Sequence, residues 1–191
     1  MKAFLTVLLV VAVSALSLQG CAPLLIGAGV GAGVVMADDR RTSATMLEDQ
    51  TIEIKAANRI QERFGNEVRV SVTSFNRYVL LTGQVPSEEV KTEAGLLVLE
   101  VANVRNIQNE LAVAGASSLM SRSNDGLLST RVKGRLVQNK NVGANHVKVV
   151  TESGSVYLMG LVTRAEAEEA AQTAATTGGV ERVVKVFEYL D

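Results

Sequence analysis

The sequence is poor in the residues that build most catalytic and metal centres. Among its 191 residues it has one cysteine, one histidine and no tryptophan, and aromatic residues make up only 4%. A single cysteine excludes a disulfide framework within the chain and any zinc site with several cysteine ligands. A single histidine excludes a site with several histidine ligands in the same way. We therefore expect no metal, no cofactor and no catalytic residue, and a protein that is not an enzyme.

Charge of either sign is not in excess. The chain carries 19 Lys and Arg against 20 Asp and Glu, a formal net charge of −1. Domains that bind nucleic acid normally need a basic excess, because phosphate contacts supply most of their affinity. We therefore expect no nucleic-acid partner. With 47% hydrophobic and 20% charged residues, the composition is that of a folded chain.

The first 21 residues have the layout of a secretory signal. Lys2 precedes an apolar run that is too short to span a bilayer, and small residues follow it. The segment ends in Leu18-Gln19-Gly20-Cys21, which resembles the bacterial lipobox. By that resemblance residues 1–20 are a signal peptide, Cys21 is lipidated, and Ala22 after it is typical of lipoproteins released to the outer membrane. The alternative is an ordinary cleaved signal followed by an unrelated cysteine, but an exposed free thiol would be a liability on an exported protein.

The stretch after Cys21, APLLIGAGVGAGVVMA at residues 22–37, alternates glycine with apolar residues. Such glycines can form a phosphate-binding loop, but that loop follows a strand within a βαβ unit, and none precedes it here. The stretch is also too short to cross a membrane. We therefore interpret residues 21–48 as the lipidated cysteine and a membrane-proximal tether.

The rest of the chain contains two copies of one sequence repeat. The segment VLLTG at residues 79–83 matches VYLMG at 156–160, and NVRNI at 103–107 matches GVERV at 179–183. Offsets of 76 or 77 residues between matching blocks place the one-residue differences in loops, where insertions are tolerated. Self-similarity in ordered blocks at a fixed offset is the signature of an internal repeat.

Each copy is predicted to form a helix, two strands, a second helix and a third strand. Apolar residues recur at helical spacing at the start of each copy and then alternate as in strands. This predicts an α+β fold with domains at residues 49–113 and 125–191, separated by a polar linker at 114–124. The helical faces expected in the two cores are Ile52, Ala56, Ile60 and Phe64 in the first copy and Leu128, Val132 and Leu136 in the second.

An αββαβ unit with a strand-ending glycine and a late Gly-Val-x-x-Val motif resembles the BON domain. The second copy has this motif at residues 179–183, whereas the first has Asn103 in place of the glycine, so its turn is expected to differ and its fold to hold. Two such units behind a lipobox resemble the dual-BON outer-membrane lipoproteins, and the match extends to DRRTS at 39–43, SND at 123–125 and MGLVT at 159–163. The resemblance implies a three-stranded mixed sheet packed on two helices in each domain.

The same resemblance implies a function. It implies a lipid-anchored outer-membrane protein that faces the periplasm of a Gram-negative bacterium and binds anionic phospholipid, such as phosphatidylglycerol or cardiolipin, through its second BON domain. It also implies support for envelope integrity and for the complex that assembles outer-membrane proteins. The aromatic residue that the family pattern places near Leu127 is absent here, which predicts weaker anchoring in the membrane interface.

The two copies differ in charge where they match in pattern. Residues 126–151 contain five Lys and Arg and no acid, whereas the corresponding residues 50–74 contain four basic and three acidic residues. Each basic side chain near an anionic membrane is worth about 1 kcal/mol, so an acid-free helix favours a lipid surface. The candidate lipid-binding residues are Leu127, Leu128, Arg131, Lys133, Arg135 and Lys140.

Three other interpretations stay open at this point. The acid-free stretch can be an ordinary solvated helix face. The protein can instead be an interaction module that docks on an envelope assembly machine, with incidental affinity for lipid. An enzyme acting on the envelope would require a cleft and a reactive group, and the sequence contains no nucleophile-elbow pattern.

Overall fold

The structure, a computed structural model, describes residues 39–114 and 119–191, except for the side chains of residues 119–123. The predicted signal peptide, Cys21 and the first part of the predicted tether lie outside the described residues. Within the described residues, no helix combines the length and apolar character needed to cross a bilayer.

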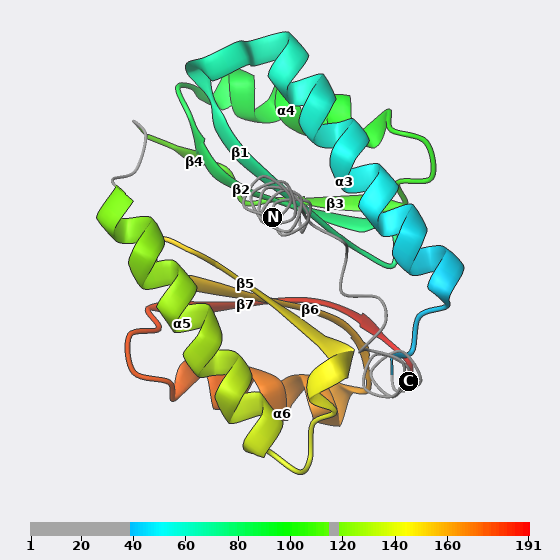
Figure 1. The fold of residues 1–191 in the computed structure, drawn as a ribbon, viewed down its shortest axis with the longest axis vertical. Coiled ribbons are helices and arrows are strands. Elements are labelled where there is room, and N and C mark those ends of the chain that lie inside the picture. Colours follow the sequence, from blue (N-terminus) through cyan, green and yellow to red (C-terminus); the bar gives the residue numbers. More distant parts are fainter. Residues whose placement is uncertain (1–38, 115–118) are drawn as a thin grey trace, which may run out of the picture. The chain divides into compact units, whose positions relative to one another are not determined.

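The first domain is a mixed sheet with two long helices (Figure 1). Strand β2 is central: β1 pairs with it in antiparallel orientation, and β3 and β4 pair with it in parallel orientation. The elements are α3 (Ser43–Phe64), η1 (Gly65–Glu67), β1 (Arg69–Phe75), β2 (Tyr78–Val85), α4 (Glu88–Leu99), β3 (Asn106–Asn109) and β4 (Ala112–Val113).

The second domain repeats this topology. Strand β6 is central, with β5 antiparallel on one side and β7 parallel on the other. The elements are α5 (Leu119–Gln138), η2 (Ala144–His146), β5 (Val147–Glu152), β6 (Ser155–Val162), α6 (Arg164–Ala175) and β7 (Arg182–Tyr189). The predicted α+β fold of two αββαβ units, each with a mixed sheet and two helices, is confirmed.

One element differs between the copies. The closing strand is continuous in the second domain but is interrupted between β3 and β4 in the first. There the side chain of Asn109 turns back: its Nδ2 donates to the carbonyl of Lys91, and its Oδ1 accepts from the backbone N–H of Leu111. Leu111 is then directed into the core, where it is fully buried.

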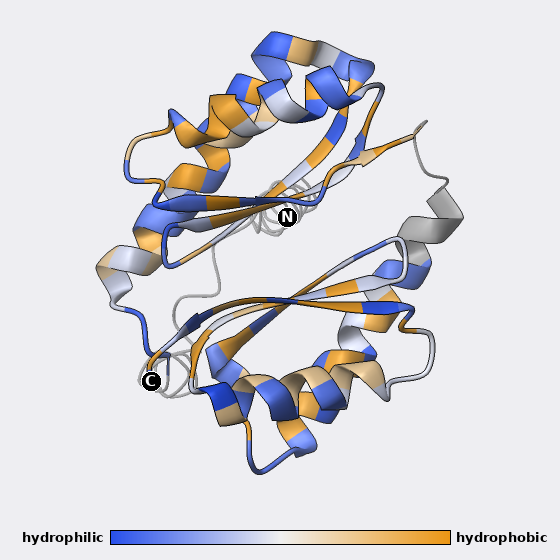
Figure 2. Cartoon of the chain, turned by 180° about the vertical axis from the view of Figure 1, so that it is seen from behind, coloured by the Kyte–Doolittle hydropathy of each residue, from blue (hydrophilic) through white to orange (hydrophobic). Residues whose placement is uncertain are grey.

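Each domain has its own apolar core, built from the predicted helical faces and the central strand. The helical spacing of apolar residues therefore predicted the buried side of the first helix in each domain correctly. Figure 2 shows apolar and polar residues interleaved along the helices and strands of both domains. The predicted core residues that are buried are Ile52, Ala56, Ile60, Phe64, Leu128, Val132 and Leu136.

Both first helices begin earlier than predicted. Helix α3 starts at Ser43, inside the predicted tether, because the Thr42 hydroxyl accepts the backbone N–H of Thr45 and caps the helix. Helix α5 starts at Leu119, inside the predicted linker. Neither added segment contains glycine or proline, so a polar composition did not prevent helix formation.

The turn in which the first copy lacks glycine keeps the conformation of the second. Asn103 has φ = 71°, and Gly179 at the equivalent position has φ = 98°. Asparagine is among the few residues that tolerate this left-handed region. The fold holds as expected, and the backbone of the turn also stays left-handed.

A third apolar cluster joins the two domains. It contains Phe75 and Leu80 from the first sheet and Tyr157, Met159 and Val186 from the second, all buried. Ion pairs and hydrogen bonds between the domains flank it, among them Arg105 with Glu188, Arg182 with Glu110, and Arg69 with Glu152. The polar contacts at this joint are more typical of an interface between domains than of a single core.

Candidate functional site

Helix α5 carries most of the candidate lipid-binding residues and has one buried and one exposed side. Leu128 is only 5% exposed and packs in the domain core with Val132 and Leu136. This burial does not favour Leu128 as a lipid contact, and its role there stays a prediction. Leu127, on the outward side, is 57% exposed and stays a candidate.

The cations on this helix divide into two groups. Arg131 and Lys133 are exposed, and neither makes a hydrogen bond or ion pair with the described part of the chain. Lys140, just beyond the end of the helix, is exposed in the same way. Arg135 differs, because its Nη1 donates to Thr177 Oγ1 at 3.2 Å and ties the helix to the turn after α6. Its guanidinium is therefore partly committed to holding the fold.

One exposed apolar side chain was missed by the sequence analysis. Val137 is 72% exposed and lies near the C-terminal end of α5, on the same helix as Leu127. The signal for it was present, because Val137 falls outside the buried spacing of Leu128, Val132 and Leu136. Together, Leu127 and Val137 place an apolar group toward each end of the basic segment.

Two glycines lie on the exposed part of α5. A Cβ added to Gly126 or Gly134 would meet no atom within 4 Å, so packing does not require glycine at either position. The equivalent positions of α3, 76 residues earlier, are Gln50 and Asn58. Glycine within a helix costs roughly 0.5–1 kcal/mol relative to alanine. No side chain covers the backbone of α5 at these two positions, so another molecule can approach it closely.

A shallow hollow of about 360 Å³ lies beside the first half of α5. Leu127 and Arg131 form one side, and the β5–β6 turn and the segment after α6 form the other. The carboxylates of Asp125 and Glu181 also line it. Because these acids oppose Arg131, the hollow itself does not concentrate positive charge, and the basic surface is the outer face of the helix.

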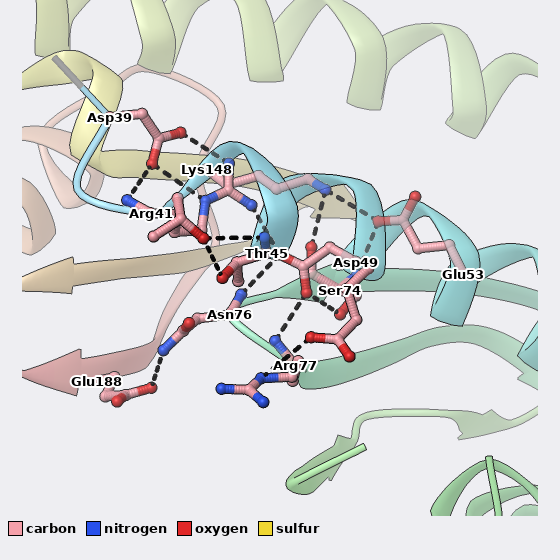
Figure 3. Close-up of polar contacts among 12 residues, drawn as sticks. Asp39, Arg41, Thr45, Asp49, Glu53, Ser74, Asn76, Arg77, Lys148 and Glu188 are labelled. Atoms are coloured by element: carbon pink, nitrogen blue, oxygen red, sulfur yellow. Dashed lines mark hydrogen bonds and ion pairs between the residues drawn. The ribbon is translucent and has the colours of Figure 1, made fainter. Parts of the chain in front are cut away.

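A buried aspartate fixes the start of each first helix to its hairpin. Asp125 accepts the backbone N–H groups of Ser153 and Gly154 at 2.8 and 3.0 Å, which hold α5 against the β5–β6 turn. Asp49 occupies the same place in the first domain and accepts the N–H groups of Asn76 and Arg77 at 2.8 and 2.7 Å (Figure 3). Sequence reasoning missed this pair, although the two aspartates are separated by the repeat offset of 76 residues.

The other titratable groups of the described residues make contacts within the fold. Among the described residues, no three His, Cys, Asp or Glu side chains are placed to hold a metal ion. His146 Nδ1 lies 3.7 Å from Glu166 Oε1. Burial raises the pKa of the Tyr157 hydroxyl, which lies in the joint between the domains and accepts a hydrogen bond from Arg182. These contacts hold elements of the fold together.

Comparison with known proteins identifies the family. The model of the BON domain matches residues 50–115 and 124–191. The outer membrane lipoprotein DolP of Haemophilus influenzae is 42% identical over 176 residues, which cover 91% of each chain. A 21 kDa hemolysin of Actinobacillus pleuropneumoniae is 32% identical over 154 residues, covering 80% of this chain and 79% of the relative. The osmotically-inducible protein Y of Escherichia coli is 30% identical over 117 residues, covering 60% of this chain and 58% of the relative.

These matches extend over both repeats and over most of the chain. The fold agrees, since each matched region contains one mixed sheet and its two helices. The chain therefore belongs to the BON-domain family, as a DolP-like outer-membrane lipoprotein with two BON domains in tandem.

Proposed function

We propose that this protein is a non-enzymatic lipoprotein that binds anionic phospholipid through the exposed face of α5 in its second BON domain. Cys21 carries the lipid anchor and holds the protein at the periplasmic face of the outer membrane. Through this contact the protein supports envelope integrity and the assembly of outer-membrane proteins. The anionic lipids in question are those with phosphate headgroups, such as phosphatidylglycerol and cardiolipin.

The observation that supports this proposal is that two cations on α5 are exposed and form no ion pair with the described residues. Arg131 and Lys133 have no carboxylate partner among the described residues, and no acid occurs between residues 126 and 151. On α3, which occupies the same place in the first domain, Arg59 pairs with Glu100 and Arg63 with Glu93, whereas Lys55, equivalent to Arg131, makes no ion pair with the described residues. Unpaired cations on a helix are free to meet phosphate groups without first losing a partner.

The apolar residues fit the same role. An interfacial helix places apolar side chains at the boundary between headgroups and acyl chains while its cations meet phosphates. Leu127 and Val137 are exposed enough to enter that boundary. Neither is aromatic, so each anchors weakly, and the lipid at Cys21 compensates by holding α5 at a high local concentration near the membrane.

Co-sedimentation with vesicles tests this proposal. The compact unit formed by residues 38–191 is mixed, without its anchor, with vesicles of phosphatidylcholine alone or with added phosphatidylglycerol. We expect binding only to the anionic vesicles, weakened by salt because exposed charges are screened. The double substitution Arg131→Glu and Lys133→Glu removes two attractions of about 1 kcal/mol each, so binding should weaken at least about 30-fold.

The matched control is Lys55→Glu on α3. Lys55 is also exposed and makes no ion pair with the described residues, so the substitution changes charge in the same way on the equivalent helix. We expect near-unchanged vesicle binding for this control. Equal binding by the α5 variant and the unsubstituted protein, with both folded by circular dichroism, would remove α5 as the lipid-binding surface.

The rival function, a protein-interaction module, has one observation in its favour. The helices of the first domain expose four large apolar side chains, which suit contact with another protein. The double variant Arg131→Glu and Lys133→Glu, expressed with its lipid anchor, separates the two functions in cells. If such a variant still supports resistance to detergents, the protein-interaction function is favoured. The exposed residues are Leu47 and Ile54 on α3 and Leu96 and Leu99 on α4.

A further inference from the structure

Residues 39–41, which we call the strap, precede α3 and contact both domains. Arg40 reaches the second domain, where its guanidinium forms two hydrogen bonds of 2.8 Å with the carboxylate of Glu166 at the start of α6. The same guanidinium donates to the carbonyl of Leu161 at 2.8 Å. A two-pronged arginine–carboxylate pair has a defined geometry, unlike a single surface contact.

The next residue of the strap is held by the first domain. Arg41 Nη1 lies 2.9 Å from Asp49 Oδ2, and its guanidinium stacks 3.8 Å from the ring centre of Phe75. Asp39 binds the same guanidinium at 2.8 Å and accepts the backbone N–H of Arg41 (Figure 3). Phe75 belongs to the apolar cluster that joins the domains, so Arg41 covers the end of that joint.

Other contacts cross between the domains at the same place. Lys148 of β5 reaches Glu53 of α3 at 3.0 Å and the carbonyl of Ser74 at 3.2 Å. Asn76, in the hairpin that Asp49 holds, donates to Glu188 of β7 at 2.8 Å. The strap is therefore one part of a polar network that ties the first hairpin to the second sheet.

The strap also lies beside the exposed part of α5. Arg41 lines one hollow of about 380 Å³ together with Lys133 and Val137 of α5 and Lys148 of β5. The chain enters the folded part next to the second half of the basic helix.

We propose that Arg40 and Arg41 are positioning residues: they form a clasp that joins the two BON domains and fixes where residues 39–41 lie against α5. The buried part of the joint is small, with five residues, and polar interfaces of this kind normally permit domain motion. The clasp suppresses that motion, so the protein presents α5 to the membrane as part of one body. Only the statement about presentation rests on the proposed lipid binding; the joining of the domains does not.

Distance measurement between the domains tests the clasp. Spin labels are placed on genetically encoded keto amino acids at Asn58 of α3 and Gln172 of α6, both exposed, so that Cys21 is untouched. The mature chain is measured by double electron–electron resonance in neutral detergent. We expect one narrow distance distribution for the protein without further substitutions and a broad one for the double variant Arg40→Gln and Arg41→Gln.

The matched control is Arg59→Gln with Arg63→Gln. It makes the same chemical change but removes ion pairs that lie within the first domain, so the distribution should stay narrow. Because Arg41 also contacts Asp49, a misfolded double variant would be uninformative by itself. The single variant Arg40→Gln leaves those contacts intact and should still broaden the distribution, and Arg40→Lys, which restores one charge contact, should narrow it partly.

Two results would overturn the clasp: distributions as narrow in Arg40→Gln as in the control, or equal breadth in Arg40→Gln and Arg40→Lys. No anionic lipid is present, so these results do not depend on whether α5 binds membranes. Failure of vesicle binding would remove the proposed lipid function and leave the clasp standing.

Discussion

Helices α3 and α5 occupy the same place in two copies of one fold, yet their exposed basic residues differ in whether they form ion pairs. On α3, Arg63 pairs with Glu93 of α4 at 2.6 Å, and Arg59 pairs at 3.8 Å with Glu100, which follows α4. On α5, Arg131 and Lys133 have no partner among the described residues. The repeat therefore preserves the buried scaffold, whereas the two domains differ in the charges on the exposed face of the first helix.

The largest expected effect concerns the buried aspartates. Asp49→Ala leaves the Ser74 hydroxyl, two backbone N–H groups and Arg41 without their acceptor, and should destabilise the first domain by about 3–5 kcal/mol. Asp125→Ala removes the acceptor of two backbone N–H groups and should cost about 2 kcal/mol. Urea unfolding measures both, and equal losses would show that the extra contacts of Asp49 add nothing.

The strand glycines come next. A Cβ on Gly83 would overlap the carbonyl oxygen of Arg69, and one on Gly160 would overlap that of His146. Gly83→Ala and Gly160→Ala should each cost about 2–4 kcal/mol, because a backbone atom must move. Gly83 has φ = 123° and should show the larger loss in thermal unfolding. A larger loss at Gly160 would mean that the close approach outweighs the backbone conformation.

A smaller effect, on vesicle affinity, is expected when an acidic residue of α3 is introduced at the equivalent position of α5. Gln138 is exposed and corresponds to Glu62 at the repeat offset of 76 residues. Gln138→Glu adds one repulsion of about 1 kcal/mol near an anionic surface, so vesicle affinity should fall about fivefold without loss of stability. The converse substitution, Glu62→Gln on α3, should leave affinity unchanged. Vesicle affinity that responds equally to both would mean that the net charge, rather than the α5 face, controls binding.

The smallest effect is a change in titration. The hydrogen bond from Arg40, with help from Thr163, lowers the pKa of Glu166 to about 2 from 4.5. Because the pKa is lowered by folding, the stabilisation is fully present above about pH 4.5 and is lost as the pH falls through 2. Arg40→Gln should raise the pKa of Glu166 in a carboxyl NMR titration. The pKa of Glu89 in the first domain, which is lowered by Ser87, should not change.

The sequence predicted the features that repeat locally. Helical spacing placed Ile52 and Leu128 in their cores, and the predicted order of helices and strands is observed in both domains. These features depend on neighbours within a few residues, which a single sequence displays directly. The starts of α3 and α5 were misplaced because polar residues were interpreted as tether and linker.

Contacts between distant segments could not be predicted. Arg40 and Glu166 are 126 residues apart, and nothing local to either residue indicates their pairing. The aspartates at positions 49 and 125 were predictable from the repeat offset, but only a structure shows that their acceptors serve the hairpins. At the candidate site, the sequence found the basic charge of α5 and missed Val137, although its place outside the buried spacing of α5 indicated that it is exposed.

The two exposed glycines of α5 have a consequence for hydrogen exchange. Gly126 and Gly134 each lower helix stability by roughly 0.5–1 kcal/mol relative to alanine, and a side chain at either position would meet no neighbour. Local opening of α5 therefore costs less than opening of α3, which has Gln50 and Asn58 at these positions. The amides of α5 are accordingly the first of the two helices to exchange with solvent. A helix that opens at low cost can adjust its curvature to the surface it meets, while the sheet beneath it stays fixed.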